Sequence, residues 1–448
     1  MAHDCGIIRR NFKLKKINLS KENFMQEIRK VAILGGSRIP FCRSVGKYKQ
    51  LGNLELLTAA VTGLVDKYSL KDQHIGEISA GAVVKRNRDF SLAREAAMAS
   101  GLNPTTNAFD CVKACGTSLE AASNLANKIA LGQIDSAIAA GTDTSSDVPI
   151  ELSDKLSQRL VQMTKSKTVI DRAKNFAGLT FGDVIPKLPS VIEGRTGLTM
   201  GQHCELMAQE WKLTQAEQDE LAFHSHQNAV TAWEEGWYND LVTPFNGADK
   251  DDNVRPGTTI EKLAKLRPCF ERSERGTMTA GNSTPLTDGA AAVLLGSEEY
   301  AKERGLEPLA YITHVQSAAV DYETREGLLM APAYAVDKLL DKAGLTLQDF
   351  DFYEIHEAFA AQVLCTLKAW ESEAFCRERL GKSAPLGSID RAKLNVKGGS
   401  VALGHPFAAT GARILAGAAK LVHENGGGRC LISICTAGGM GITAIVEK

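Results

Sequence analysis

The sequence predicts an α/β protein made of two similar halves, with a mainly helical segment inserted in the first half. Short apolar runs, typical of buried strands, alternate with helical patterns over residues 31–150 and again after residue 277. Residues 151–276 lose this alternation and are mixed, helical and rich in lysine. We therefore expect a first half of residues 31–150 plus 277–305, an inserted domain of residues 151–276, and a second half of residues 306–448.

In the first half, the pattern predicts strands near residues 31–36, 75–84, 106–111, 136–140 and 290–295, and a helix over 54–67. A second helix begins near Thr117 and ends at Gly132. Cys115 therefore lies in the turn that enters this helix.

In the second half, strands are expected near residues 309–315, 350–355 and 429–435, with a helix over 333–343. A further helix follows His405, because proline is favoured at the first position of a helix and Pro406 comes next. His405 thus also stands at a helix entrance, after a glycine-rich turn.

The two halves repeat the same order of elements. A helix, an acidic loop and a strand occur at 54–84 and again at 333–355. A cysteine or histidine at a helix entrance (Cys115 or His405), then a helix, a strand and a glycine turn, occur at 115–144 and again at 405–441. This indicates an internal duplication. If the halves pack about a pseudo-twofold axis, Cys115 and His405 face one site at the strand ends, where α/β sheets bind ligands.

The composition and net charge argue against several classes of protein. The net charge of −1 gives no reason to expect nucleic acid as a partner, and no apolar run is long enough for a membrane span. Ten cysteines in 448 residues, none in a C-x-x-C pair, argue against a disulfide scaffold and against zinc. We expect a reducing compartment, the cytoplasm or, in a eukaryote, the mitochondrial matrix. Residues 1–30 form a basic extension without the apolar core of a secretory signal.

Four residues at strand or helix corners are the candidate catalytic set: Cys115, His356, His405 and Cys435. Taken singly, each cysteine is more often a small buried residue, and a histidine in such a turn is more often structural. Together they suggest nucleophilic catalysis. A helix N-terminus favours the thiolate of Cys115, and a neighbouring histidine can take its proton.

The chain resembles the thiolase family from about Val31 to Lys448. The resemblance rests on A-C-G-T-S-L-E-A at 114–121, H-E-A-F-A-A-Q at 356–362, G-G-S-V-A-L-G-H-P-F-A-A-T-G at 398–411 and C-T-A-G-G-M-G at 435–441. T-A-G-N-S-T-P-L-T-D-G at 279–289 and L-T-M-G at 198–201 add to it. It implies a duplicated, five-layered αβαβα core with an inserted domain that holds coenzyme A, and no metal or prosthetic group.

The resemblance also implies the reaction. Cys115 attacks the keto carbon of a 3-ketoacyl-CoA, Cys435 protonates the departing acetyl-CoA carbanion, and CoA then takes the acyl group. His405 serves as the base and as an oxyanion donor, and His356 completes that first oxyanion hole, holding a water. The backbone N–H groups of Cys115 and Ala437 form the second. CoA contacts are implied at Met200, Arg255, Ala280, Gly281, Thr284 and Phe359. Arg255 fits a surface charge equally well.

Histidine at position 356, where many thiolases carry asparagine, is similar to the β-subunit of the fatty-acid oxidation trifunctional complex and its bacterial relatives. This favours degradative 3-ketoacyl-CoA thiolysis, with acetyl-CoA acetyltransferase as the alternative. A β-ketoacyl synthase or HMG-CoA synthase shares the duplicated fold, but neither is expected to carry the Cys435 motif or this CoA-binding insertion. A non-catalytic scaffold subunit would have no use for two activated thiols.

Partners are expectations from the same resemblance. The family implies a homodimer or homotetramer, and a hydratase/dehydrogenase α-subunit is a further candidate partner. Leu152, Leu156, Leu160 and Met163 recur at helical spacing between charges, which allows an amphipathic membrane-contacting helix within residues 151–190. A helix that lines the substrate tunnel or a subunit contact fits this pattern as well. The lysines of this segment are typical of a solvated surface.

Overall fold

The computed structural model describes residues 28–187 and 191–448, whose strands form a ten-stranded sheet in the order β4-β3-β5-β6-β1-β7-β10-β9-β8. The short strand β2 lies off this path and pairs with β6. The predicted extension of residues 1–30 lies outside the described residues, apart from its last three. The strands are β1 Val31–Arg38, β2 Cys42–Arg43, β3 Glu77–Ala80, β4 Asn107–Asp110, β5 Ser136–Asp143, β6 Thr287–Ser297, β7 Ala310–Ala319, β8 Phe352–Ile355, β9 Arg429–Thr436 and β10 Met440–Glu447.

The strand order is symmetric about the pair β1–β7, which is antiparallel and short. Outward from this pair, β6, β5 and β3 on one side match β10, β9 and β8 on the other. The first two neighbours on each side pair antiparallel and the third pairs parallel. Beyond β8, a single parallel bridge between Tyr353 and Leu394 stands where β4 pairs with β3. This symmetry confirms the predicted duplication.

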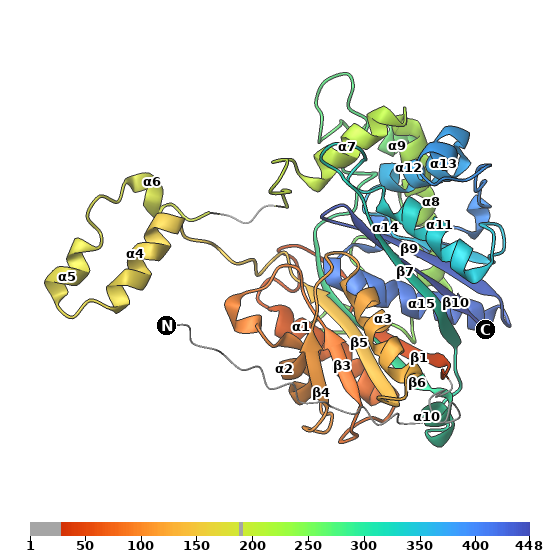
Figure 1. Cartoon of the computed structure of the whole chain (residues 1–448), viewed down its shortest axis with the longest axis horizontal. Coiled ribbons are helices and arrows are strands. Elements are labelled where there is room, and N and C mark those ends of the chain that lie inside the picture. Colours follow the sequence, from red (N-terminus) through yellow and green to blue (C-terminus); the bar gives the residue numbers. More distant parts are fainter. Residues whose placement is uncertain (1–27, 188–190) are drawn as a thin grey trace, which may run out of the picture.

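Helices make three layers around the two halves of the sheet (Figure 1). Helices α1 (Asn53–Lys67) and α2 (Leu92–Ala99) cover the outer face of the first half. Helices α11 (Ala331–Ala343) and α12 (Ala360–Glu371) cover the outer face of the second half. Between the halves lie α3 (Thr117–Ala130) and α15 (Thr410–Glu424), buried against each other. The αβαβα layering expected from the resemblance is therefore present.

The central helices approach closely because small residues line their contact. Ala122 and Ala126 of α3, with Ala412 and Ala418 of α15, belong to one buried cluster. A Cβ on Gly411 would come within 2.5 Å of the backbone nitrogen of Leu119, so only glycine fits there. The prediction of a helix directly after His405 is off by one turn, since Phe407–Ala409 form a 3₁₀ turn and α15 begins at Thr410.

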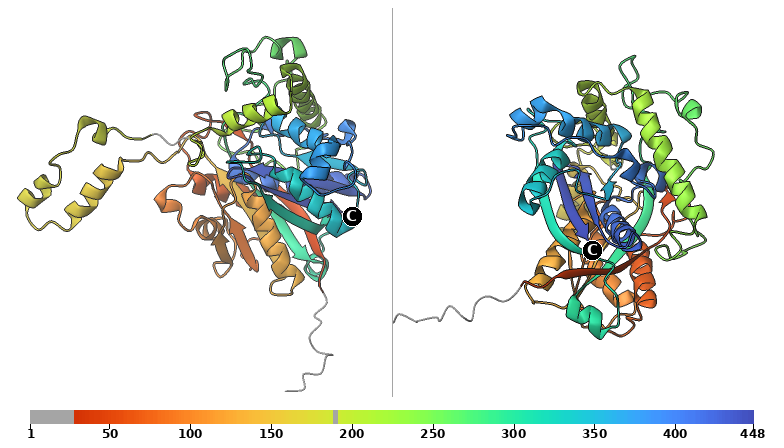
Figure 2. Two further views of the ribbon diagram at one scale, coloured as in Figure 1. Left: turned by 45° about the horizontal axis from the view of Figure 1, so that its top comes forward. Right: turned by 90° about the vertical axis from the view of Figure 1, so that its right-hand side faces the viewer.

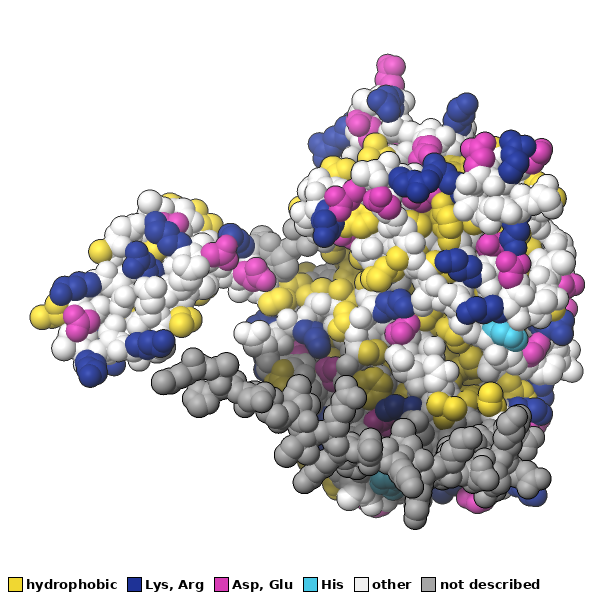
Figure 3. Space-filling model, in the orientation of Figure 1, with side chains coloured by type: hydrophobic (Ala, Val, Ile, Leu, Met, Phe, Trp, Pro, Cys, Tyr) yellow, Lys and Arg dark blue, Asp and Glu magenta, His cyan; other side chains and the backbone are white. Residues whose placement is uncertain are grey.

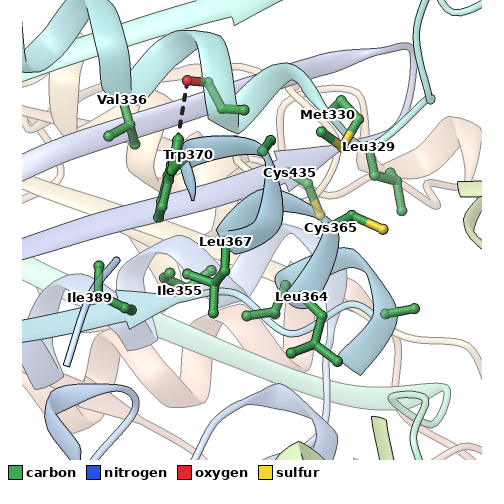
Figure 4. Packing of buried hydrophobic residues seen from close by; sticks show 14 of the residues in the cluster. Leu329, Met330, Val336, Ile355, Leu364, Cys365, Leu367, Trp370, Ile389 and Cys435 are labelled. Carbon is green, nitrogen blue, oxygen red and sulfur yellow. Dashed lines mark hydrogen bonds between the residues drawn. The ribbon is translucent and has the colours of Figure 1, made fainter. Parts of the chain in front are cut away.

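The outer layer of the second half holds the largest buried cluster, shown from close by in Figure 4. Trp370 of α12 is fully buried and its indole Nε1 donates to the carbonyl oxygen of Ala333 at 3.4 Å. This bond joins α12 to α11 inside an otherwise apolar layer. Cys435, near the end of β9, belongs to the same cluster, and it lines the candidate site together with Leu329 and Phe359. The packing of this layer therefore fixes one wall of the candidate site.

The segment between β5 and β6 divides into two parts. Helices α7 (Met200–Glu210), α8 (Gln215–Glu234) and α9 (Ile260–Leu263) pack onto the second half, with α7 and α8 against α12. Helices α4 (Asp154–Thr164), α5 (Val169–Lys174) and α6 (Phe181–Val184) form a projecting arm, residues 151–187, that extends away from the body (Figures 1 and 2). The expected domain boundaries at residues 150, 276 and 305 stay a prediction. The remaining short helices are α10 Glu298–Glu303, α13 Glu373–Glu378, α14 Ser400–Leu403 and the 3₁₀ turns Asn87–Asp89 and Arg391–Lys393.

The projecting arm has both buried and exposed apolar residues. In the predicted amphipathic stripe, Leu156 is buried, Leu160 and Met163 are half-buried, and Leu152 is exposed. Other apolar side chains of the arm, among them Val169 and Phe181, are exposed. Figure 3 shows hydrophobic side chains on the arm interspersed with lysine and arginine. In the described residues, no helix is long and apolar enough to cross a membrane.

Replacing Gly411 by alanine is expected to lower the free energy of unfolding by about 1–3 kcal/mol, because the new methyl group overpacks the α3–α15 contact. Urea denaturation of both proteins at one concentration measures this difference. Gly417 of the same helix is the matched control. A Cβ there would meet its nearest neighbour, Trp237, at 3.7 Å, so Gly417→Ala should be neutral or stabilising. Equal stability of G411A and the original protein would contradict the role given to this contact.

Candidate active site

Cys115 is presented by a tight turn between β4 and α3. Ala114, just before it, has a φ of 44°, which is a left-handed conformation that residues other than glycine rarely adopt. The turn is held by the hydroxyl of Thr117, which donates to the carbonyl oxygen of Ala114 at 2.7 Å and accepts from the N–H of Lys113 at 2.8 Å. These bonds keep the Cys115 thiol directed at the second half.

His405 enters from the equivalent corner of the second half. Its backbone N–H donates to the hydroxyl of Thr287 on β6 at 2.7 Å, so the first half holds the turn that carries it. Its ring nitrogen Nε2 lies 3.1 Å from Cys115 Sγ, and Nδ1 lies 2.6 Å from the hydroxyl of Thr410. The predicted meeting of Cys115 and His405 therefore occurs in the structure.

His356 follows β8 and is fully buried beside His405. The two rings have centroids 4.1 Å apart. His356 Nδ1 lies 2.8 Å from the hydroxyl of Ser400, whereas Nε2 has no hydrogen-bond partner among the described residues. Cys115 Sγ and one ring nitrogen of each histidine all lie within 4.8 Å of one another. The three residues thus form one cluster.

Cys435 completes the set from the end of β9. It lines the same cavity, of about 470 Å³, as Cys115 and His405. The cavity wall is largely apolar and includes Phe270, Leu329 and Phe407. All four residues that the sequence predicted as catalytic are therefore brought to one place, two thiols and two imidazoles with an apolar cavity in front of them.

Burial sets the charge state of the cluster. It raises the pKa of the Cys115 thiol to about 12, and the backbone N–H groups of Ala437 and of Cys115 itself oppose this shift. Burial, helped by the charge of Arg413, lowers the pKa of His405 to about 3. The resting pair is therefore a neutral thiol and a neutral imidazole. A helix N-terminus favours the thiolate, as expected from the sequence, but burial opposes it and raises the pKa of this thiol.

The other two catalytic candidates are also neutral. Burial, together with the nearby Cys115, raises the pKa of the Cys435 thiol well above its ordinary value. Burial, His405 and Arg413 lower the pKa of His356 well below its ordinary value. At neutral pH the cavity wall therefore carries two protonated thiols and the uncharged imidazole of His405, with the uncharged His356 directly beside it. Such a site suits proton exchange with a bound substrate more than attraction of a charged one.

Of the predicted CoA contacts, Met200, Thr284 and Phe359 line the cavity. Arg255 and Ala280 line an adjoining opening, which shares Cys269, Phe270 and Thr284 with the cavity. Gly281 is buried behind this wall, where a Cβ would strike Leu263 and Leu266. Its role toward CoA stays a prediction.

Sequence reasoning missed several residues that the structure places at the site. Arg43 lines the opening with Arg255, and its charge contributes to a lowered pKa of Arg255 after burial. Ser400 and Arg413 contact each other behind His356. Ser400 and Arg413 lie in or directly after the motif around His405, but no local pattern tells which of its polar residues reach the histidines. Arg43 offered no signal in the sequence.

Comparison with known proteins agrees with this site. The thiolase N-terminal domain family matches residues 31–299, and the thiolase C-terminal domain family matches residues 306–448. A 3-ketoacyl-CoA thiolase of Vibrio cholerae is 42% identical over 433 residues, which cover 94% of this chain and 99% of that protein. One of Yersinia enterocolitica is 41% identical over 424 residues, covering 93% and 97%.

Solved structures share the fold. The acetyl-CoA acetyltransferase of Bacillus anthracis matches with a TM-score of 0.79 at 30% identity, covering 94% of this chain and 99% of that one. The human mitochondrial 3-ketoacyl-CoA thiolase in complex with CoA matches with a TM-score of 0.78 at 28% identity, covering 94% and 98%. The sequence matches, the fold and the cysteine–histidine cluster lead to one conclusion: this chain belongs to the thiolase family.

Proposed function

We propose that this chain is a 3-ketoacyl-CoA thiolase, which cleaves 3-ketoacyl-CoA with free CoA into acetyl-CoA and a shortened acyl-CoA in fatty-acid oxidation. The observation that carries the proposal is the 3.1 Å contact of Cys115 Sγ with His405 Nε2 in a cavity that also holds Cys435. Relatives bearing that name, at about two-fifths identity, support the substrate class.

In the first half-reaction, Cys115 gives its proton to His405 Nε2 while Sγ attacks the keto carbon of the substrate. The neutral resting pair means that this proton moves as the new C–S bond forms, since no thiolate is stored beforehand. Negative charge then develops on the former keto oxygen. The protonated His405 and the neutral His356 are the two donors available to this oxygen. Each such donor lowers the barrier of the reaction by about 2.7–4 kcal/mol.

Cys435 acts as the second acid and base. Its raised pKa keeps it protonated at rest, ready to give its proton to the acetyl-CoA carbanion when the Cα–Cβ bond breaks. The thiolate left on Cys435 then takes the proton of incoming CoA, whose sulfur attacks the acyl group on Cys115. The bond between the acyl carbon and Cys115 Sγ breaks, and the departing thiolate recovers its proton from His405 Nε2. The N–H groups of Ala437 and Cys115, which already lie near Cys115 Sγ, serve the thioester oxygen in this step.

Acetyl-CoA acetyltransferase activity is the alternative, since a structural relative carries that name. The largely apolar cavity wall favours a longer acyl chain, because acetoacetyl-CoA offers little apolar surface to bury. Self-association as a dimer or tetramer, a hydratase/dehydrogenase partner, membrane contact and the cellular location stay predictions.

We propose that CoA enters through the opening lined by Arg43 and Arg255. Two guanidinium groups at one mouth suit the phosphates of CoA, because each can form paired hydrogen bonds with phosphate oxygens. Arg43 is oriented by the side-chain oxygen of Asn253, to which its Nη2 donates at 2.9 Å. The pantetheine arm would then pass Thr284 and Phe359 toward the cysteines.

Cleavage of a medium- or long-chain 3-ketoacyl-CoA is expected to be faster than cleavage of acetoacetyl-CoA, measured as kcat/KM from CoA-dependent loss of the 3-keto chromophore. Cys115→Ala should reduce both rates about a thousandfold or more, because the nucleophile is lost. Cys42→Ala is the control, since Cys42 is a buried cysteine that belongs to another cluster. Cleavage of acetoacetyl-CoA alone would select the alternative activity.

Alkylation of Cys115 by iodoacetamide should speed up about tenfold per pH unit from about pH 7 to about pH 9, because only the thiolate reacts and its pKa is far above this range. Peptide mapping follows the rate, with the exposed Cys269 as an internal reference for reagent access. A rate that stays flat across this range would instead reveal a thiolate–imidazolium pair at rest.

Arg43→Gln and Arg255→Gln should each raise KM for CoA about three- to tenfold with little change in kcat, a modest effect because the opening is exposed to solvent. The penalty should shrink with dephospho-CoA, which lacks the 3′-phosphate, and at high salt. Arg377→Gln, an exposed arginine of α13, is the control. An unchanged KM in both variants would remove this opening from CoA binding.

A further inference from the structure

The two ring nitrogens of His356 have different surroundings. Nδ1 faces the hydroxyl of Ser400 at 2.8 Å, whereas Nε2 is unpartnered among the described residues and the ring is fully buried. A neutral imidazole carries one proton, and only the nitrogen that bears it can donate a hydrogen bond. Whether His356 can donate to a substrate therefore depends on which nitrogen holds the proton.

The hydroxyl of Ser400 determines which nitrogen of His356 carries the proton, because it also contacts Arg413. Arg413 Nη2 lies 2.8 Å from the same hydroxyl oxygen, and a guanidinium can only donate. The hydroxyl therefore accepts from Arg413 and has a single proton left to give. Within the described part of the chain, Nδ1 of His356 is the one acceptor that contacts Ser400 Oγ. A buried hydroxyl that left its proton unpaired would be costly, so Ser400 donates to Nδ1.

Arg413 is held in place for this contact. It is buried at the start of α15, and its Nη1 lies 3.9 Å from the carboxylate of Glu354 on β8, two residues before His356. Burial raises the pKa of Glu354 to about 7, and Arg413 opposes that shift. A guanidinium stays charged in proteins, so a positive charge stands beside a neutral histidine. Its direction is set by Glu354 on β8 and by Ser400 on α14.

We propose that Ser400 and Arg413 are positioning residues that hold His356 in the tautomer with the proton on Nε2, so that an N–H donor points into the catalytic cluster. The catalytic role of this N–H donor rests on the proposed function, whereas the tautomer of His356 does not depend on it. His405 is required in the opposite form, with a bare Nε2 to take the Cys115 proton and its own proton on Nδ1 toward Thr410. The adjacent rings would thus divide the roles of donor and acceptor.

The first test is the tautomer of the whole protein without substrate. Long-range ¹H–¹⁵N correlation spectra of protein labelled at histidine distinguish protonated from bare ring nitrogens, and loss of one signal set in His356→Gln assigns the residue. We expect His356 to be neutral with the proton on Nε2. A proton on Nδ1, or an even mixture, would overturn the proposal whether or not the protein proves to be a thiolase.

The second test separates positioning from packing. Ser400→Ala should give a mixed tautomer and lower kcat about three- to thirtyfold with a smaller change in KM, and Ser400→Thr, which keeps the hydroxyl, should restore both. Ser433→Ala is the matched control, because that buried hydroxyl has no partner among the described residues. Arg413→Lys keeps a donor and should keep the Nε2–H form. A single Nε2–H tautomer with unchanged kcat in S400A would overturn the role of Ser400.

Discussion

The close packing of α3 against α15 is the contact on which the rest of the structure depends. Gly411 brings α15 against the backbone of Leu119, and the N–H of Ala412 donates to the hydroxyl of Ser118 at 2.7 Å. Each of these helices starts near a reactive residue, Cys115 for α3 and His405 for α15. The distance between thiol and imidazole is therefore set by how two buried helices meet. The pairing of β1 with β7 joins the two halves of the sheet.

Burial is the second determinant, and it makes the site neutral. The pKa values of both cysteines rise and those of both histidines fall, so charge appears only when substrate arrives. The permanent charge of Arg413 stands behind the histidines, beside Glu354, and not in the cavity. In such a site, the transition state is stabilised by fixed hydrogen-bond donors that point at the developing oxyanion. These donors need no reorganisation during the reaction because they are already oriented.

Much of this was predictable from the sequence, because the signals were local. Apolar runs bounded by glycines marked most of the core strands, and the repeated order of elements placed Cys115 and His405 at equivalent corners. The last strand, β10, was not recognised, since its start lies in the glycine-rich motif that follows Cys435. The apolar stripe around Leu156 was recognised as a helix face, but its partner inside the projecting arm depends on a chain reversal that no local pattern reveals.

The finer features of the site depended on tertiary contacts. The charge state of Cys115 depends on how deeply the thiol is buried, which the sequence does not report. Ser400 and Arg413 could not be assigned a role from the sequence, because only the packing of α14 and α15 brings them together beside His356. Arg43 reaches the mouth of the cavity from the opposite end of the chain to the catalytic histidines.

Because the first half carries Cys115 and the second carries His356, His405 and Cys435, neither half holds a complete reaction centre. Each has its own strands and its own outer helical layer, so each can keep much of its secondary structure while the other is displaced. Catalytic turnover is then a more demanding reporter of refolding than circular dichroism. Recovery of activity would lag behind recovery of helical signal by the time that the two halves take to dock.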